Sequence, residues 1–267
     1  MALALVVYLV AGAGSGQTGR VPTYSDEAVV LRTQNLGEAD RIVTLLTRRN
    51  GKVRAVARGV RRTSSKYGAR LEPFSQVDLQ LATGRSLHYV AQAVTRNAFG
   101  EPLVVDYPRY TAGQAMLETA DRLVAEEGEP AVQQYLLLVG ALRALGQGVA
   151  GGETRPGAQL LDSYLLRALA VAGYAPALAA CARCGRPDRL DFFSPAAGGV
   201  VCGQCRQPGS VAAGPQLRAY LGGLLAGDWD STRDADPALQ RTASGVVAAF
   251  TNWQLERGLR SLRHVER

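Results

Sequence analysis

The sequence contains only two histidines, and neither suggests a catalytic site. His88 lies in a predicted strand and His264 lies near the C-terminus, and neither is close in sequence to a nucleophile or a pair of carboxylates. General acid–base and nucleophilic catalysis require such groups within hydrogen-bond reach of one another. The sequence therefore favours a binding protein over an enzyme.

A run of apolar residues long enough to cross a membrane is also missing. Residues 1–20 begin apolar, but this part is too short for a bilayer and lacks the basic start of a secretory signal. Gly14–Gly19 matches G-x-G-x-x-G, and Ala11–Thr18 approaches a P-loop with Gln17 at the lysine position. Both motifs require a helix to begin at once, but Val21-Pro22 follows instead. We expect a disordered extension or a misassigned start here, with a cleaved signal as the alternative, and no membrane partner.

Aromatic residues are few, at 6%, whereas basic residues are concentrated in one part of the chain. Between Val21 and Phe99 there are 13 Lys and Arg against 6 Asp and Glu, a net charge of +7. From Gly100 onward there are 16 against 17, a net charge of −1. This imbalance indicates nucleic acid or an anionic membrane surface as the partner, and it carries no information about the fold.

The basic stretch from Gly37 to Phe74 contains a predicted surface for an extended polyanion such as a nucleic acid. Asn50-Gly51 predicts a hairpin with a tight primed turn, because both residues accept positive φ angles. After this turn, apolar and cationic residues alternate, so the cations share one strand face at intervals of about 6.5 Å. The predicted contacts are Arg41, Lys52, Arg54, Arg58, Arg61, Arg62, Lys66, Tyr67 and Arg70. Tyr67 is the candidate for stacking on a base, and a merely solvated strand face is the alternative.

Short runs of alternating apolar residues predict a β-domain at residues 21–99. The expected strands are Ala28–Thr33, Arg41–Arg48, Lys52–Val60, Ser75–Leu81 and Leu87–Val94. Five short strands in about seventy residues are typical of an OB-type barrel, although an SH3-like barrel has a similar pattern.

From residue 100 to residue 267 the hydrophobic spacing is helical. The expected helices are Tyr107–Glu126, Ala131–Leu145, Gly157–Ala172, Pro215–Ala226 and Pro237–Arg260. Pro130 suits the first turn of the second helix. The predicted fold is therefore α+β and multidomain, with an N-terminal five-stranded barrel and an all-α domain into which a cysteine-containing segment, residues 179–210, is inserted.

All four cysteines lie in this inserted segment, as two C-x₂-C pairs. They are Cys181, Cys184, Cys202 and Cys205. This spacing is typical of a zinc ribbon, with two short strands expected at Phe192-Phe193 and Val200-Val201. Four thiolates complete a tetrahedron, so we predict one structural Zn²⁺ with no open position for catalysis. Two disulfides are the alternative and would require an oxidising compartment.

Several of these segments together resemble a known protein family. The N-terminal domain of the bacterial RecO family of DNA-repair proteins is similar to this chain in four segments, which are Gly37–Arg41, Asn50–Lys52, Ala57–Arg62 and Leu71–Phe74. The resemblance extends over about Val21 to Arg267. It implies an N-terminal OB-fold, a helical domain and, as in many members, a four-cysteine zinc site.

The same resemblance implies a recombination mediator. Such a protein binds single- and double-stranded DNA, anneals complementary strands, associates with RecR, and helps to load RecA onto single strands coated by single-strand binding protein (SSB). We therefore expect a cytoplasmic, nucleoid-associated protein. The alternative is an RNA-binding or ribosome-associated OB-fold zinc protein, because it would have the same basic barrel.

Overall fold

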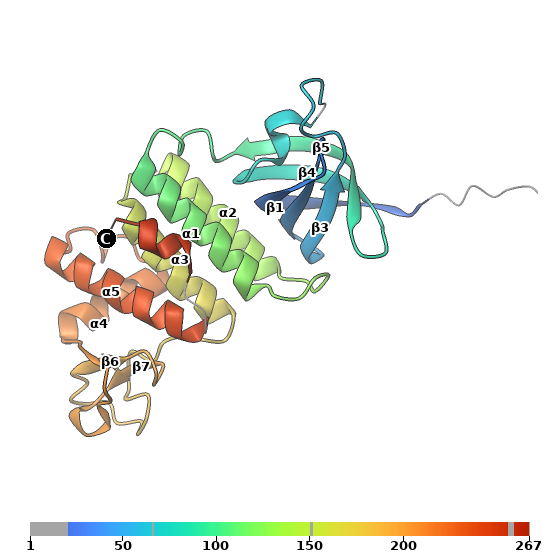
Figure 1. Cartoon of the computed structure of the whole chain (residues 1–267). Helices are drawn as coiled ribbons and strands as arrows, with labels where there is room; N and C mark the ends of the chain where they lie inside the picture. The colour runs from blue at the N-terminus through green and yellow to red at the C-terminus, as the bar shows by residue number, and fades with distance from the viewer. Residues whose placement is uncertain (1–20, 66, 150–151, 256–258, 267) are drawn as a thin grey trace, which may run out of the picture.

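Alternating apolar side chains close the first part of the chain into a barrel (Figure 1). The structure, a computed structural model, describes residues 21–65, 67–149, 152–255 and 259–266, so the prediction for residues 1–20 falls outside it. Within these residues, the barrel strands are β1 (Thr23–Leu36), β2 (Asp40–Thr47), β3 (Gly51–Ala57), β4 (Ser75–Ala82) and β5 (His88–Ala98). Their order is β1-β2-β3-β5-β4, and the parallel pair of β3 and β5 closes the barrel. The predicted five-stranded OB-type barrel is confirmed.

Strand β1 is apolar on both faces and longer than predicted. Ala28 and Val30 point into the barrel interior, whereas Val29 and Leu31 belong to the core of the helical domain. Successive side chains of a strand point to opposite faces, so one short apolar run serves two cores. The strand extends beyond Ala28–Thr33 because its polar ends pair with β4 on one side and with β2 on the other.

The hairpin between β2 and β3 is present, but its turn differs from the prediction. Thr47 pairs with Gly51, which leaves the three residues Arg48 to Asn50 in the loop. Gly51 has a φ of 59°, whereas Asn50 is not among the residues with positive φ. The connection is therefore a three-residue loop followed by a left-handed glycine, and not a two-residue primed turn.

A bundle of helices follows the barrel. Its long helices are α1 (Tyr107–Leu123), α2 (Val132–Gln147), α3 (Gly157–Val171), α4 (Pro215–Ala226) and α5 (Pro237–Gln254). The side chains of Asp106 and Asp236 cap α1 and α5 by accepting backbone N–H groups, and a proline follows each cap. Pro130 lies before α2, whose N-cap is Ala131, so the first-turn prediction for Pro130 is wrong.

Helix α5 ends at Gln254, before the predicted Arg260. A 3₁₀ turn, η4 (Ser261–His264), follows and packs on α1. The Glu118 carboxylate of α1 accepts the backbone N–H groups of Arg260 and Ser261 at 2.9 and 2.8 Å. These contacts hold the end of the chain on the bundle. No helix in the described part of the chain is both long and apolar enough to span a membrane.

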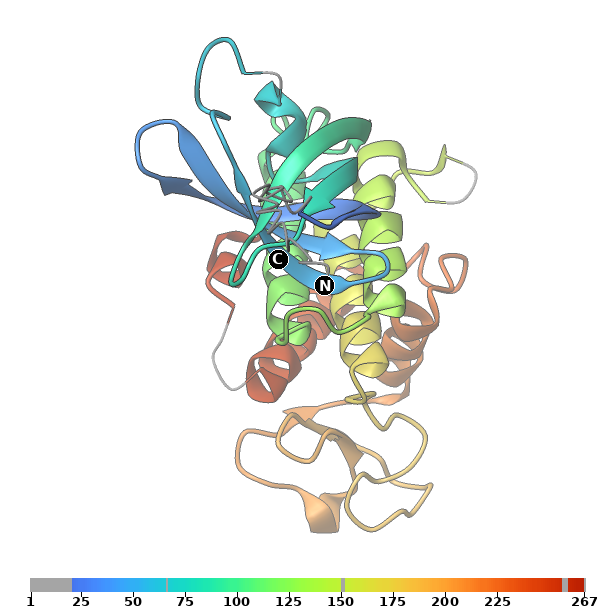
Figure 2. The ribbon, with the colours of Figure 1, turned by 90° about the vertical axis from the view of Figure 1, so that its right-hand side faces the viewer.

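The cysteine-containing segment forms a small sheet at the far end of the bundle from the barrel (Figures 1 and 2). It contains β6 (Phe192–Ser194), β7 (Gly199–Val201) and β8 (Val211–Ala212), in the order β7-β6-β8. The first two strands were predicted and the third was not. Phe193 meets Phe250 of α5 edge to face, with ring centroids 5.7 Å apart, so the segment shares its core with the helices.

Candidate nucleic-acid surface and metal centre

Acidic residues of β1 neutralise the cations at the β2–β3 turn. Asp26 is buried and accepts hydrogen bonds from the backbone N–H groups of Arg49 and Asn50. The Arg48 guanidinium lies 3.0 Å from Glu27, and that of Arg49 lies 3.7 Å from Asp26. The turn end of the barrel therefore offers little free positive charge.

The first two cations of β3 face the helical domain and not open solvent. Lys52 Nζ donates to the Asp121 backbone carbonyl at 2.8 Å and lies 3.3 Å from its carboxylate, and its side chain is only 12% exposed. Arg54 lies 3.7 Å from Glu127 in the α1–α2 connection. The row of cations predicted on β3 is thus interrupted, because residues about seventy positions later in the sequence supply carboxylates to it.

Backbone contacts reinforce this junction. The Gly128 N–H donates to the Lys52 carbonyl at 3.0 Å, and Gly51 and Lys52 form isolated bridges with Glu127. Val29, Leu31, Leu46 and Phe74 of the barrel complete the apolar part of the contact within the helical core. The sequence interpretation missed this interface, although the apolar residues on the outer face of β1 were a visible signal for it.

Four exposed arginines remain at the other end of β3. They are Arg58, Arg61, Arg62 and Arg70, which we call the arginine surface. None of them forms an ion pair with any described residue. Arg41, in contrast, pairs with Glu72, and Lys66 lies outside the described residues. Guanidinium groups without acidic partners are suited to bind phosphate oxygens.

Tyr67 does not face solvent, which corrects its prediction as a stacking residue. Its side chain belongs to the barrel core and is only 6% exposed. Its hydroxyl donates to the carbonyl oxygens of Val90 and Ala91, at 3.1 and 3.0 Å. The ring is therefore inaccessible to a base. The outward-facing aromatic residue near the arginine surface is instead Tyr89, which is 38% exposed and lies under Arg58.

The four cysteines come together at one point. Their sulfur atoms all lie within 4.8 Å of one another, and all four are free thiols. The Cys184 and Cys202 sulfurs are 3.9 Å apart. A tetrahedral zinc ion with four Zn–S bonds of about 2.3 Å would separate its sulfurs by about 3.8 Å. The donor set therefore fits one metal ion.

Backbone groups prepare this site for thiolates. Burial raises the pKa of Cys181, but the backbone N–H groups of Cys184, Cys202 and Arg183 donate to its sulfur and lower the pKa to about 6. Hydrogen bonding with the Cys202 and Cys184 sulfurs raises the pKa of Cys205 to about 12. Four sulfurs this close cannot all ionise without a cation, and a bound metal ion supplies the compensating charge.

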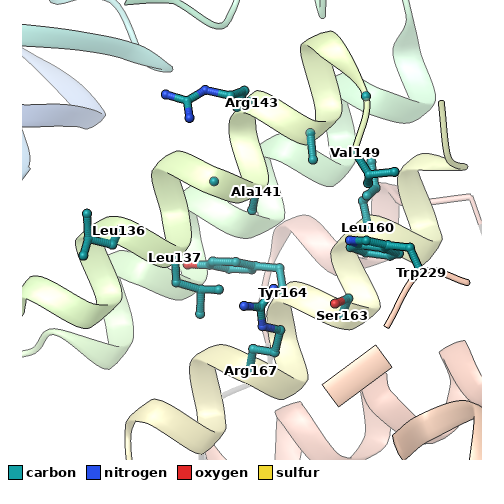
Figure 3. A pocket seen from close by; sticks show the side chains of 13 residues that line it. Leu136, Leu137, Ala141, Arg143, Val149, Leu160, Ser163, Tyr164, Arg167 and Trp229 are labelled. Carbon is teal, nitrogen blue, oxygen red and sulfur yellow. The ribbon is translucent and has the colours of Figure 1, made fainter. Parts of the chain in front are cut away.

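A pocket of about 390 Å³ lies between α2 and α3. Its lining includes Leu137, Leu160 and Trp229, and Arg143 and Arg167 contribute positive charge from the two helices (Figure 3). The buried hydroxyl of Tyr164 has no hydrogen-bond partner among the described residues. The pocket can therefore accept an apolar side chain with an anionic group beside it.

Comparison with known proteins covers nearly the whole chain. A family model described as "Recombination protein O N terminal" matches residues 21–99, and "Recombination protein O C terminal" matches residues 104–263. Curated relatives named "DNA repair protein RecO" include that of Nocardioides sp., which is 59% identical over 247 residues, 91% of this chain and 99% of the relative. That of Streptomyces coelicolor is 58% identical over 250 residues, with the same coverage. The Cutibacterium acnes relative is 55% identical over 247 residues, 92% of this chain and all of the relative.

Proposed function

The chain belongs to the RecO family of DNA repair proteins, and from this premise we propose that it is a recombination mediator that binds single- and double-stranded DNA. In this proposal it anneals complementary strands and, with RecR, helps to load RecA onto SSB-coated single strands. It acts by binding and not by catalysis, in the cytoplasm and in association with the nucleoid. The observation that carries the proposal is the arginine surface, whose four guanidinium groups have no acidic partners among the described residues.

The proposed mechanism of annealing is charge neutralisation. Two DNA strands repel each other through their phosphates, and arginines that bind those phosphates reduce the repulsion while leaving the bases free to pair. Phosphate contacts carry no sequence information. Binding through Arg58, Arg61, Arg62 and Arg70 is therefore independent of sequence.

We propose Zn²⁺ as the metal held by Cys181, Cys184, Cys202 and Cys205. The support is the all-sulfur donor set and its near-tetrahedral spacing. Such a site has no open coordination position, so the metal stabilises the small sheet and does not activate water. Val200 and Val201 lie between the two cysteine pairs and are buried in the helical core. The metal therefore also supports the bundle.

For the contact with SSB, we propose the pocket between α2 and α3. An apolar side chain of SSB would fill the cavity against Leu137 and Leu160, and a neighbouring carboxylate would meet Arg143 or Arg167. We expect Arg143→Glu to weaken SSB binding at least tenfold in a calorimetric titration. Arg241→Glu, an exposed residue of α5 outside the pocket lining, is the matched control. If the two variants had equal affinity for SSB, the proposal that SSB binds in this pocket would be wrong.

DNA binding is tested by a double charge reversal on the arginine surface. We expect Arg58→Glu/Arg61→Glu to weaken binding of single-stranded DNA more than tenfold in fluorescence anisotropy at 100 mM salt, roughly equally for all sequences. Arg183→Glu/Arg189→Glu, on the cysteine-containing segment, makes the same charge change at exposed positions far from the barrel. This control should bind normally.

If Arg58→Glu/Arg61→Glu bound normally and Arg183→Glu/Arg189→Glu bound weakly, the DNA-binding surface would lie on the cysteine-containing segment instead. Competition between DNA and RNA of the same sequence separates the proposal from the RNA-binding alternative. A clear preference for RNA would contradict a function in DNA repair.

A further inference from the structure

One aromatic ring on the barrel is turned outward beside the arginine surface. Tyr89 lies on β5, where the barrel closes by parallel pairing of Val56 with Tyr89. Val90 points into the barrel core, so the alternation along the strand turns Tyr89 to the outer face. Its side chain is 38% exposed, although an aromatic ring normally gains stability from burial.

The orientation of this ring is fixed by its neighbours. The guanidinium carbon of Arg58 lies over the ring, 4.6 Å from its centroid. Gly84 of the β4–β5 connection lies beside the ring, where an added Cβ would be 3.2 Å from Tyr89 Cε2. A cation therefore already lies over the face of this ring at the barrel surface before any ligand binds.

The other barrel aromatics are committed to internal contacts. Phe74 and Phe99 are buried, and Tyr67 is buried with its hydroxyl bonded to the backbone. Tyr24 meets the ring of His88 edge-on, and its hydroxyl lies 3.3 Å from His88 Nδ1. Among the aromatic residues that the structure describes in the barrel, Tyr89 alone presents an exposed ring next to an arginine.

We propose that Arg58 and Tyr89 form a subsite for one unpaired nucleobase. A base is planar and can stack on a guanidinium plane or on an aromatic ring, and such stacking tolerates any base. Arg62 packs against Gly59, next to Arg58, with its Cδ 3.7 Å from the position of an added Cβ. It can therefore hold the phosphate beside that base.

This subsite rests on the proposed function. It adds to that function a distinction between single-stranded and double-stranded DNA, which phosphate binding alone does not make. In a duplex each base is already stacked between its neighbours and paired, so it cannot reach a platform on the protein surface. Phosphates are present in both forms of DNA. The arginine surface alone therefore binds either form, and the Arg58–Tyr89 subsite adds affinity for single strands only.

The test separates bases from phosphates. Anisotropy titrations at one salt concentration would compare oligo-dT with an abasic oligonucleotide of the same length and the same number of phosphates. We expect the wild type to bind oligo-dT at least about fivefold more tightly, the lower limit of what one stacked base contributes. Tyr89→Leu should abolish this preference while leaving affinity for the abasic strand and its salt dependence unchanged. Tyr89→Phe, which keeps the ring, should retain the preference.

Leucine preserves apolar volume at this position, and unchanged circular dichroism and melting temperature would show that the variant is folded. Arg58→Lys keeps the charge but loses the planar group, so it should lower the preference without a large loss on the abasic strand. The subsite is wrong if Tyr89→Leu keeps the preference, or if the wild type binds both strands equally while the arginine reversals still abolish binding. If the wild type binds neither strand, the proposed function itself fails, and the subsite fails with it.

Discussion

Two glycines have nearly the same backbone angle but different surroundings. Gly37 has a φ of 60° and Gly51 a φ of 59°, both in the left-handed region. A Cβ added to Gly37 meets nothing within 4 Å, whereas one added to Gly51 would lie 1.6 Å from the backbone oxygen of Glu129. Gly37 is needed only for the backbone conformation of its turn. Gly51 is also needed because the absence of a side chain lets the β2–β3 hairpin approach the helical domain.

We therefore predict different costs for alanine at these two positions. Gly37→Ala should lower the free energy of unfolding by about 1 kcal/mol, from backbone strain alone. Gly51→Ala should cost at least about 2 kcal/mol more, because the α1–α2 connection must move away and weaken the contact of Lys52 with Asp121. Urea titrations of both variants measure the difference. Equal costs would show that the junction tolerates displacement.

Glu118 gives a residue-scale prediction with a defined pH dependence. Partial burial raises its pKa, but hydrogen bonds from the Ser261 hydroxyl and from the backbone N–H groups of Arg260 and Ser261 outweigh burial and lower the pKa. Because the folded-state pKa is depressed, the stabilisation is fully present above the unfolded-state value of about 4.3. It is lost as the pH falls through the lower folded-state pKa.

Glu118→Gln should accordingly lower the free energy of unfolding by about 1.5 kcal/mol at pH 7. The difference from the wild type should shrink as the pH falls below about 4. Chemical denaturation at pH 7, 5 and 3.5 provides the measurement. Glu126→Gln, an exposed residue just after α1, is the control and should show no such trend. A constant difference at all three pH values would exclude the carboxylate as the cause.

At the scale of elements, local patterns predicted most of the barrel and the cysteine cluster. A run of β-branched and leucine residues located β2 to within one residue, and alternation located β4 equally well. Helix α4 begins and ends at the predicted residues. The C-x₂-C spacing alone indicated that the cysteines meet. The ends of β1 could not be predicted, because they are polar and are fixed by pairing with β2 and β4. Such pairing leaves no periodic signal in the strand itself.

The metal site supports a prediction at the same scale. Elemental analysis of the reduced protein should find one zinc ion per chain. Cys184→Ser, or removal of the metal by a chelator, should lower the free energy of unfolding of the helical domain by at least about 3 kcal/mol, a fraction of what structural zinc contributes in small fingers. The effect reaches the bundle because Phe193 packs against Phe250 of α5. Affinity for DNA should change less than twofold, since the barrel lies at the other end of the bundle.

Thermal unfolding followed by circular dichroism, with DNA anisotropy on the same samples, would measure both quantities. Absence of zinc, or disulfides in mass spectrometry, would exclude the metal site. A large loss of DNA affinity in Cys184→Ser would mean that the cysteine-containing segment contacts DNA.

At the scale of the whole molecule, the sequence correctly indicated which strand face carries cations but not what covers them. Lys52 and Arg54 share that face with Arg58, yet the first two are covered by Asp121 and Glu127 and only the third is exposed. Alternation along a strand defines the direction of a side chain and contains no information about a domain that begins later in the chain. Tyr67 was expected outside for another reason: it lies in the loop after β3, where no alternation indicates that its ring packs into the barrel core and its hydroxyl bonds to the backbone of β5.

This division of the cations sets the salt dependence of DNA binding. Lys52, Arg54 and Arg41 are held by carboxylates, so among the described residues of the predicted surface the four arginines of the arginine surface remain. Each of them is expected to neutralise one phosphate of a single strand. At a slope of about −0.7 per phosphate, log affinity should fall with log salt at about −2.8, which is a loss of about 50-fold between 50 and 200 mM. Anisotropy titrations over this range measure the slope. Arg58→Glu/Arg61→Glu should make the slope shallower, at about −1.4 or closer to zero.

A steeper wild-type slope would have a structural meaning. A value near −4 would require about six phosphate contacts, two more than the arginine surface supplies. If Lys52 and Arg54 supply these two contacts, they must leave Asp121 and Glu127, and the barrel must separate from the bundle when DNA binds. Gly51→Ala should then raise the affinity for DNA without changing the slope, because it already loosens the junction that binding must open. A slope of about −2.8, with an affinity that Gly51→Ala leaves unchanged, would show that the barrel binds DNA while docked on the helical domain.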